Sequence, residues 1–366
     1  MGLKTEQFFL GIMSGTSCDG LDLALVGFSE LNENVSFRWI AQRMIPYDNA
    51  LRLRLLDCSK LGAQALAYLE NEWTIFVADS VNAFLAEHAE KPICIGFHGH
   101  TVFHRPELGY TVQMGSGATL SARCRIDVVC DFRQQDTACG GQGAPLVPVC
   151  ERDLFSQFDA FLNIGGFANA SLRDIESDKW TAFDVCGANI VLNKYAEYLE
   201  LPYDANGAIA RSGEVNTELI AELQNLTSNQ RADNRNSLGL EWLELHTIPI
   251  LERWLVEQQN RDYLQTIALA NLLASYTEFI ALRCGVLFKS GNVLVSGGGA
   301  HNGYLIERLR HNCASNLIIA DQRITDFKEA LAFAYLAFCR INFRENTLVS
   351  VTGANRANIG GAWYKA

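Results

Sequence analysis

Apolar runs separated by short, glycine-rich turns recur along this chain. Residues 8–13 and 21–28 are two such runs, and the residues between them are small and polar. This pattern predicts a β-hairpin with a glycine-rich turn. Glycine adds no bulk and backbone amides can point at an anion, so the turn is suited to gripping a phosphate. An ordinary polar turn between two strands is the alternative.

The first half continues with alternating strand and helix patterns. Apolar positions at helical spacing predict one long helix, or two, over residues 61–88. A short apolar run then ends at His98, where a turn through Thr101 is expected, because ligands gather at the carboxyl ends of strands in open α/β sheets. Further strands are predicted at residues 36–45, 93–97, 111–114 and 127–130.

The second half follows a similar plan. Residues 161–172 again form an apolar run, a small-residue turn and an apolar run. Strands at residues 181–184 and 292–296 and helices at 189–199 and 264–287 follow, and the last strand runs into a triglycine turn at 297–299. This weak repetition predicts a duplicated α/β domain with a cleft between the copies, and chance likeness of two α/β halves is the alternative.

A glycine and proline cluster at residues 138–148 marks the expected domain boundary. We therefore predict an N-terminal domain over residues 1–145 and a C-terminal domain over 146–366. Residues 348–366 contain more turn signals than helix signals, so a tail of turns is expected.

Composition narrows the class of protein. The 366 residues are 49% hydrophobic and carry a formal net charge of -11, which argues against nucleic acid and anionic membranes as partners. Eleven cysteines without a Cys-x-x-Cys pair suit reduced thiols in a cytosol. We see no signal peptide, and no apolar run approaches the ~20 residues of a membrane span. A soluble, cytoplasmic protein is expected.

Carboxylates that follow predicted strands are candidates for a general base. Asp131, Asp136 and Asp184 have such positions, and Asp184 precedes a small-residue turn. The alternative for Asp184 is an N-cap of the helix that starts at Asn189. Arg133 is the best candidate to hold an anionic substrate group, because a guanidinium can donate two bonds to a carboxylate. Its alternative is a surface ion pair with Asp136.

Other polar residues are less decisive. His98, His100 and His104 lack the neighbouring ligands of a zinc site, so we expect His98 and His100 to donate hydrogen bonds or to pack at the strand end. In the first hairpin, Thr16 and Ser17 offer hydroxyls. Asp19 and Asp22 would repel a bare phosphate but suit one that carries Mg²⁺. Glu329 is expected at a helix start, where a favourable interaction with the helix dipole is the simpler explanation.

Six stretches together resemble one known family. They are GIMSGTSCDGLDLAL, GFHGHTVFHRP, DFRQQDTACGGQGAPLVP, LNIGGFANAS, SGGGAHN and KEALAFAYLA, and the matching motifs run from Gly11 to Gly353. Each is weak alone, but their order is that of the anhydro-N-acetylmuramic acid kinase family. This family belongs to the actin, hexokinase and Hsp70 ATPase superfamily, so the resemblance implies a duplicated actin-like (ribonuclease H-like) fold with two domains.

The resemblance also implies an activity. Such an enzyme uses ATP and Mg²⁺ to convert 1,6-anhydro-N-acetylmuramic acid into N-acetylmuramic acid 6-phosphate, in the recycling of cell-wall sugars. Asp184 would act as the base toward water, and a homodimer is expected. The expected ATP-binding residues are Gly15, Thr16, Ser17, Cys18, Asp19, Gly20, Leu21, Asp22, Gly165, Gly166, Gly297, Gly298 and Gly299, with Asp19 and Asp22 near the metal. The expected sugar-binding residues are His98, Thr101, Asp131, Arg133, Asn169 and Glu329.

One segment departs from the family pattern. The family commonly has Phe-Asp-Thr-Gly-Pro-Gly-Asn around the base, whereas residues 183–189 here read Phe-Asp-Val-Cys-Gly-Ala-Asn. The aspartate and asparagine are kept, but the threonine hydroxyl is lost. A kinase of another sugar in the same fold and a non-catalytic ATP-binding sensor are therefore kept as alternatives.

Overall fold

The fold is taken from a computed structural model that describes residues 5–15, 18–228, 238–259 and 265–366. The chain divides into two compact units. Unit 1 comprises Met1–Ser156 and Phe327–Ala366, and unit 2 comprises Gln157–Asp326. This grouping differs from a single division after residue 145, because the last forty residues of the chain return to unit 1.

Unit 1 is built on a six-stranded sheet with the order β13-β7-β4-β1-β2-β3. Strands β1, β2 and β3 are antiparallel neighbours, whereas β4 and β7 run parallel to β1. A separate two-stranded ribbon is formed by β5 and β6. The elements of unit 1 are β1 (Gln7–Met13), β2 (Gly20–Leu31), β3 (Asn34–Pro46), α1 (Asn49–Leu56), α2 (Ala63–Ala86), β4 (Cys94–Phe97), β5 (His100–Arg105), β6 (Tyr110–Met114), α3 (Gly117–Cys124), β7 (Asp127–Cys130), α4 (Gln134–Ala138), α5 (Val147–Leu154), α13 (Gln322–Ile341) from Phe327 onward, α14 (Val349–Thr352) and β13 (Ala362–Tyr364).

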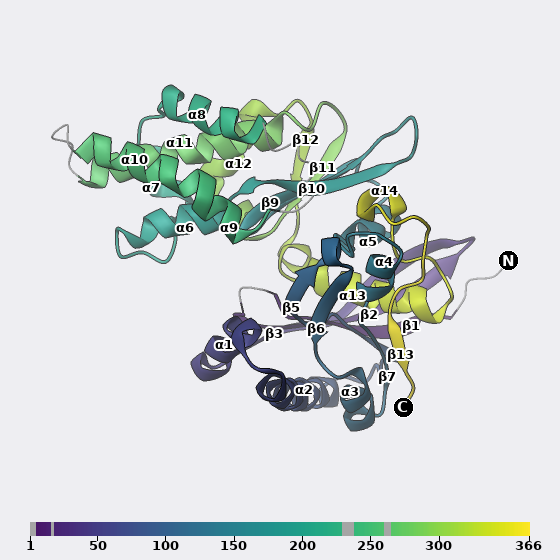
Figure 1. Cartoon of the computed structure of the whole chain (residues 1–366). Coiled ribbons are helices and arrows are strands. Elements are labelled where there is room, and N and C mark those ends of the chain that lie inside the picture. The colour runs from purple at the N-terminus through teal and green to yellow at the C-terminus, as the bar shows by residue number, and fades with distance from the viewer. Residues whose placement is uncertain (1–4, 16–17, 229–237, 260–264) are drawn as a thin grey trace. The chain divides into compact units, whose positions relative to one another are not determined.

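Unit 2 is built on a five-stranded sheet with the order β10-β9-β8-β11-β12. Helices α6 to α11 lie between β10 and β11 in the chain, as the colours of Figure 1 show. The elements of unit 2 are β8 (Ala160–Ile164), β9 (Phe167–Arg173), β10 (Trp180–Gly187), α6 (Asn189–Glu197), α7 (Ala208–Ser212), α8 (Thr217–Ser228), α9 (Leu240–Trp242), α10 (Ile248–Gln259), α11 (Gln265–Gly285), β11 (Asn292–Ser296), α12 (Gly303–Asn312) and β12 (Asn316–Ile319).

The two sheets repeat one plan. In unit 2, β8, β9 and β10 are antiparallel neighbours, and β11 and β12 run parallel to β8. Strands β8 to β12 thus stand to one another as β1, β2, β3, β4 and β7 do in unit 1. The prediction of a duplicated α/β domain from two similar hairpins is confirmed.

The sheet of unit 1 is covered on both faces. On one face, side chains from β1 and β2 such as Leu10 and Leu23 pack against Trp73 and Val77 of α2. On the other face, Phe9 and Phe28 pack against α13, with ring centroids 5.2 to 5.6 Å apart where they meet Tyr335 and Phe338. Alternate residues of a strand point to opposite faces, which is why a continuous apolar run can fill both layers.

Two glycines bring α13 into contact with the backbone of this sheet. A Cβ added to Gly11 of β1 would lie 1.7 Å from the carbonyl oxygen of Ala330, and one added to Gly96 of β4 would lie 2.0 Å from that of Phe333. Any larger residue would therefore displace the helix. A buried ion pair between Lys328 and Glu151, 2.8 Å apart, also holds α13, in this case to α5.

Helix α11 is the central helix of the unit 2 core. Its buried residues lie around most of its circumference, which is typical of a core helix. Among the described residues it is the one helix long and apolar enough to cross a bilayer, and 78% of its most apolar stretch is buried in the structure. The expectation that no apolar run approaches that length was therefore wrong, and burial in the core accounts for the run.

Three local predictions need correction. The tail is not only turns, since β13 pairs antiparallel with β7 and completes the sheet. His100 and Thr101 lie in strand β5 rather than in a turn. Glu329 lies in the middle of α13 rather than at a helix start, so the helix dipole does not explain it.

We predict that Gly11→Ala lowers the free energy of unfolding by about 1–3 kcal/mol, because the added methyl group collides with helix backbone that cannot rotate away. Urea denaturation followed by fluorescence measures this change. Gly62→Ala is the matched control, since nothing lies within 4 Å of a Cβ at that position. Equal stability of the two variants would contradict the close contact of α13 with the sheet.

Candidate active site

Asp184 lies within β10, next to a β-bulge between Asp184 and Cys186. Its carboxylate accepts a hydrogen bond of 2.6 Å from the backbone amide of Leu238. The alternative role as a helix N-cap is excluded, because Ala188 occupies the N-cap of α6 and no side chain caps that helix. A carboxylate with a fixed orientation that is partly open to solvent suits a general base.

Asp184 begins a row of polar residues that crosses the sheet of unit 2. Asn169 of β9 pairs with Asp184 on one side and with Asn163 of β8 on the other, and Ser296 of β11 pairs with Asn163. The Ser296 hydroxyl lies 3.3 Å from Oδ1 of Asn163. Directly paired residues share one face of a sheet, so the four side chains form a continuous polar row. Sequence reasoning named Asp184 and Asn169 but missed Asn163 and Ser296.

The predicted glycine turns of unit 2 lie next to one another at the carboxyl ends of β8 and β11. A Cβ on Gly299 would lie 2.3 Å from Cγ2 of Ile164, and one on Gly297 would lie 2.7 Å from the Ile164 carbonyl oxygen. These two glycines are required by packing. By contrast, a Cβ on Gly298, Gly165 or Gly166 would meet nothing closer than 3.6 Å.

The start of α6 completes this group of turns. The amides of Ala188 and Ile190 donate to the Gly166 carbonyl, and the Asn189 amide donates to the Gly165 carbonyl. The Asn189 side chain donates to the Ile164 carbonyl at 3.3 Å. The result is a fixed backbone cradle in which Gly165, Gly166 and Gly298 leave space above the chain. Such a surface suits a ligand that lies against the backbone.

The first hairpin of unit 1 rests on a buried chain of hydrogen bonds. Trp73 donates to the Tyr47 hydroxyl at 3.2 Å, and this hydroxyl donates to Ser14 at 2.9 Å. Gly20 is required, since its Cβ would lie 2.7 Å from the backbone carbonyl oxygen of Ile45 on β3. The hydrogen bonds from Trp73 through Tyr47 to Ser14 thus hold the start of the turn in place.

The residues predicted for ATP in this hairpin differ in accessibility. Cys18 and Leu21 are buried, so they can offer a ligand only their backbone. Asp19 is exposed and Asp22 is half-buried, so solvent reaches both side chains. Gly15 is linked to Cys18 through a backbone hydrogen bond of 3.1 Å. The predicted roles of Thr16 and Ser17 lie outside the described residues.

Arg133 is held in place by two uncharged partners. Its Nε and Nη2 lie 3.2 and 3.0 Å from Nε2 of His98, and its Nη1 donates to the Gly143 carbonyl at 2.7 Å. His98 Nδ1 lies 2.8 Å from the Gly99 carbonyl, which can only accept, so Nδ1 carries the proton and Nε2 accepts from Arg133. The expectation that His98 donates hydrogen bonds is met at Nδ1.

The alternative of a surface ion pair between Arg133 and Asp136 is wrong, because Asp136 is fully buried and bonds to other groups. Burial lowers the pKa of Arg133 to about 10, and the negative charge of Glu329 opposes that shift. With a pKa of about 10, the guanidinium is charged at neutral pH. In the described part of the chain, no carboxylate forms an ion pair with Arg133 at contact distance. Arg133 therefore keeps its charge for an anion.

The other residues of unit 1 that were predicted to bind the sugar come from separate elements. Glu329 and Asp131 are exposed, and Asp131 follows β7 with a positive φ of 56°. Thr101 pairs with Gln113 in the β5–β6 ribbon. His98, Asp131 and Arg133 thus follow the parallel strands β4 and β7, as the sequence predicted.

The sequence as a whole matches the family model for anhydro-N-acetylmuramic acid kinase over residues 7–366. The chain belongs to the anhydro-N-acetylmuramic acid kinase family. The anhydro-N-acetylmuramic acid kinase of Pseudomonas syringae pv. syringae (strain B728a) is 35% identical, over 99% of this chain and 100% of that protein. That of Haemophilus influenzae (strain ATCC 51907 / DSM 11121 / KW20 / Rd) is 34% identical, over 98% of both chains.

Solved structures are more distant. Component A of (R)-2-hydroxyglutaryl-CoA dehydratase from Acidaminococcus fermentans has 11% sequence identity and a TM-score of 0.46, over 92% of this chain and 99% of that chain. The two repeated sheets of this kinase family member agree with the duplicated actin-like fold that the sequence resemblance implied.

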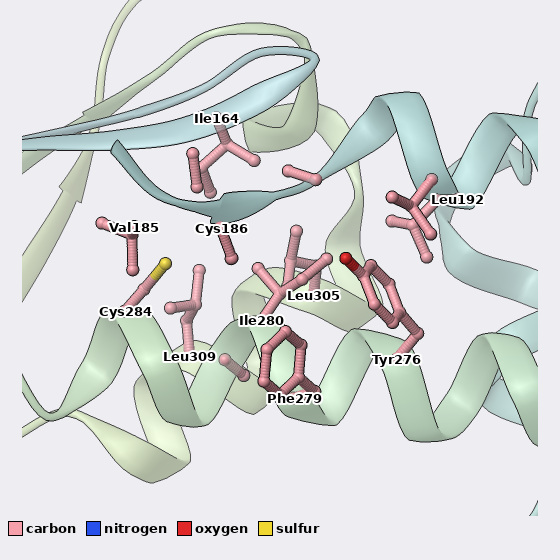
Figure 2. Packing of buried hydrophobic residues seen from close by; sticks show 14 of the residues in the cluster. Ile164, Val185, Cys186, Leu192, Tyr276, Phe279, Ile280, Cys284, Leu305 and Leu309 are labelled. Carbon is pink, nitrogen blue, oxygen red and sulfur yellow. The ribbon is translucent and has the colours of Figure 1, made fainter. Parts of the chain in front are cut away.

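The departure from the family pattern lies in the core of unit 2. Val185 and Cys186 are buried, and Figure 2 shows them among the apolar side chains of α11 and its neighbours. The Tyr276 hydroxyl donates to the Gly187 carbonyl at 3.1 Å, and Cys186 hydrogen-bonds with Cys284, whose pKa this bond and burial raise. The changed residues therefore pack inward, whereas Asp184 keeps its partners Leu238 and Asn169.

All eleven cysteines are free thiols, and most are buried, as the sequence predicted for a reducing compartment. Burial raises the pKa of Cys18 to about 11 and that of Cys130 to about 12, so both remain protonated at neutral pH. Such thiols pack as small apolar groups.

We predict that acid destabilises the protein as the pH falls from about 6.5 to 5. Burial lowers the pKa values of His98, His100 and His104, so the unfolded chain binds more protons than the folded chain in this range. Each histidine then removes up to about 1.4 kcal/mol of stability per pH unit. Urea denaturation at several pH values measures the slope.

His98→Gln should make this slope shallower, because one of the three groups is removed. The exposed His301 provides the control, and His301→Gln should leave the slope unchanged. A slope that His98→Gln does not alter would show that His98 is not neutral in the folded protein.

Proposed function

We propose that this protein is an ATP-dependent kinase that hydrolytically opens 1,6-anhydro-N-acetylmuramic acid and phosphorylates it to N-acetylmuramic acid 6-phosphate. The observation that carries this proposal is the family match across residues 7–366, which includes both glycine hairpins, Asp184, Arg133 and Glu329. The two relatives at 34–35% identity carry the name of this enzyme, and the match covers 98% or more of their length.

The reaction needs a base that takes a proton from water and a sugar oxygen that accepts the phosphoryl group. Asp184 takes a proton from water while the water oxygen bonds to C1 of the sugar. The bond from C1 to O6 breaks, and O6 bonds to the γ-phosphorus as its bond to ADP breaks. Phosphoryl transfer of this kind depends on positioning and charge stabilisation more than on covalent chemistry. The amide of Leu238 fixes the carboxylate orientation that the first step requires.

We assign nucleotide binding to the glycine turns of each unit. In unit 2, the open positions Gly165, Gly166 and Gly298 leave room for a ligand against the backbone, and Gly297 and Gly299 shape the turn. In unit 1, Gly15 to Asp22 would hold phosphates through backbone amides. Mg²⁺ would accompany the phosphates, and the carboxylates of Asp19 and Asp22 supply the oxygen donors that this ion prefers.

We assign sugar binding to His98, Thr101, Asp131, Arg133, Asn169 and Glu329. N-acetylmuramic acid carries a carboxylate on its lactyl ether, and Arg133 offers a charged guanidinium that is already oriented by His98 and Gly143. A pre-oriented guanidinium loses little entropy when it binds a carboxylate. This favours an acidic sugar over a neutral one.

We further propose a cytoplasmic homodimer that acts in the recycling of cell-wall sugars. The eleven reduced cysteines support a reducing compartment. A coupled ADP-release assay tests the activity against its alternatives. Turnover with another sugar only would indicate a kinase of different specificity, and ATP binding without turnover on any sugar would indicate a sensor.

We predict that Asp184→Asn lowers kcat by two orders of magnitude or more, roughly the contribution of a general base, while ATP affinity stays nearly unchanged. Asp178→Asn is the matched control, because Asp178 is exposed on the connection between β9 and β10 and pairs only at the surface with Arg173. Near-normal kcat in the Asp184 variant would remove this residue as the base.

We predict that Gly298→Val weakens ATP binding but leaves the fold intact, since a Cβ at Gly298 would come no closer than 3.8 Å to another atom, Nδ2 of Asn189. Gly299→Ala is the contrasting variant and should lose stability, because its methyl group would collide with Ile164. Calorimetric titration with ATP and thermal melting separate the two effects. Unchanged ATP affinity in Gly298→Val would exclude the triglycine turn from the nucleotide site.

A further inference from the structure

Asp136 is a fully buried carboxylate with three hydrogen-bond donors. The amide of Gly143 donates to Oδ2 at 2.9 Å, and the side chains of Thr352 and Asn358 donate to Oδ1 at 2.9 and 3.1 Å. These donors carry no formal charge. Two of them come from the C-terminal segment, more than two hundred residues further along the chain. A buried carboxylate is costly unless it is satisfied in this way.

Gly143 connects this carboxylate to Arg133. Asp136 accepts from the N–H of Gly143, and Arg133 donates to the carbonyl of the same residue. Gly143 has a φ of +64°, and its Cβ would lie 2.6 Å from Oγ1 of Thr137 and 3.1 Å from the Arg133 carbonyl. The glycine is therefore pressed against α4 and cannot shift without disturbing the guanidinium.

The C-terminal segment clamps the loop that carries Gly143. The amide of Gln142 donates to the Thr352 carbonyl at 2.7 Å, and that of Asn355 donates to the Cys139 carbonyl at 2.9 Å. The loop of residues 139–143 is thus held from one side by Asp136 and from the other by residues 352–358.

We propose that Asp136 is a positioning residue for Arg133, and that the C-terminal segment completes the sugar-binding part of the site through it. A direct ion pair would neutralise Arg133. Contact through Gly143 fixes the guanidinium instead and leaves its charge available for the carboxylate of the sugar. This inference rests on the proposed function, because it concerns how the same site binds an acidic sugar.

The test uses Thr352→Val, which removes one donor to Asp136 and keeps the backbone bond from Gln142. Thr347→Val is the matched control, since the Thr347 hydroxyl is buried shortly before Thr352 in the chain and has no hydrogen-bond partner among the described residues. We expect Thr352→Val to raise KM for the anhydro sugar about tenfold, as for the loss of one hydrogen bond to a charged group. KM for ATP should stay unchanged, and Thr347→Val should alter neither constant.

A double-mutant cycle separates positioning from general stability. With Arg133→Ala as background, Thr352→Val should have little further effect on the KM for the sugar, because the group that it positions is gone. If the Asp136→Asn variant folds, it should raise the KM for the sugar more than Thr352→Val does. If it does not fold, Thr352→Val alone tests whether Asp136 positions Arg133.

Two results would overturn the proposal. One is a lower melting temperature of Thr352→Val with an unchanged KM for the sugar. The other is an effect of equal size with and without Arg133. Absence of wild-type turnover with 1,6-anhydro-N-acetylmuramic acid would instead overturn the proposed function, and calorimetric titration of wild type and Thr352→Val with the sugar would still test the role of Asp136.

Discussion

The position of α13 depends on backbone contact with the sheet at Gly11 and Gly96. No side chain separates the helix from strands β1 and β4 at these points. This contact places Phe333 against the His98 ring, with centroids 4.6 Å apart, and places Glu329 one turn earlier on the helix, where its charge acts on Arg133. A helix spaced away by ordinary side chains would move both groups by several ångströms. Two glycines therefore fix where Phe333 and Glu329 lie relative to His98 and Arg133.

In unit 2, strand register rather than helix packing determines where the polar side chains lie. Asp184, Asn169, Asn163 and Ser296 are brought into one row because four strands pair without a shift between them at that level. A slip of one residue would turn each side chain to the opposite face. The bulge after Asp184 changes the register only beyond this row, and it directs Val185 and Cys186 into the core.

Much of this fold follows from local sequence patterns. The two hairpins, most of the sheet strands and the long helices α2 and α11 were predicted because apolar periodicity and glycine turns are local signals. Strands β5 and β12 were not predicted. Strand β13, the mid-helix position of Glu329 and the burial of Asp136 were not predicted. Each depends on partners far along the chain, such as Thr352 for Asp136 or β7 for β13. Of the missed residues of the polar row, Asn163 and Ser296 carried a usable signal, since Asn163 interrupts an apolar strand and Ser296 ends one.

The altered residues after Asp184 show why proximity in sequence is a poor guide to the site. Val185 and Cys186 replace residues of the family pattern directly beside the proposed base, yet both are buried against α11 (Figure 2). A valine and a cysteine suit that apolar environment, and the Cys284 thiol offers the cysteine a partner. The carboxylate of Asp184 instead accepts a hydrogen bond from the Leu238 amide, and residue 184 pairs with Asn169 on the neighbouring strand. The residues that select the sugar should therefore be sought at Arg133 and at the groups that orient it, His98 and Gly143, rather than beside Asp184.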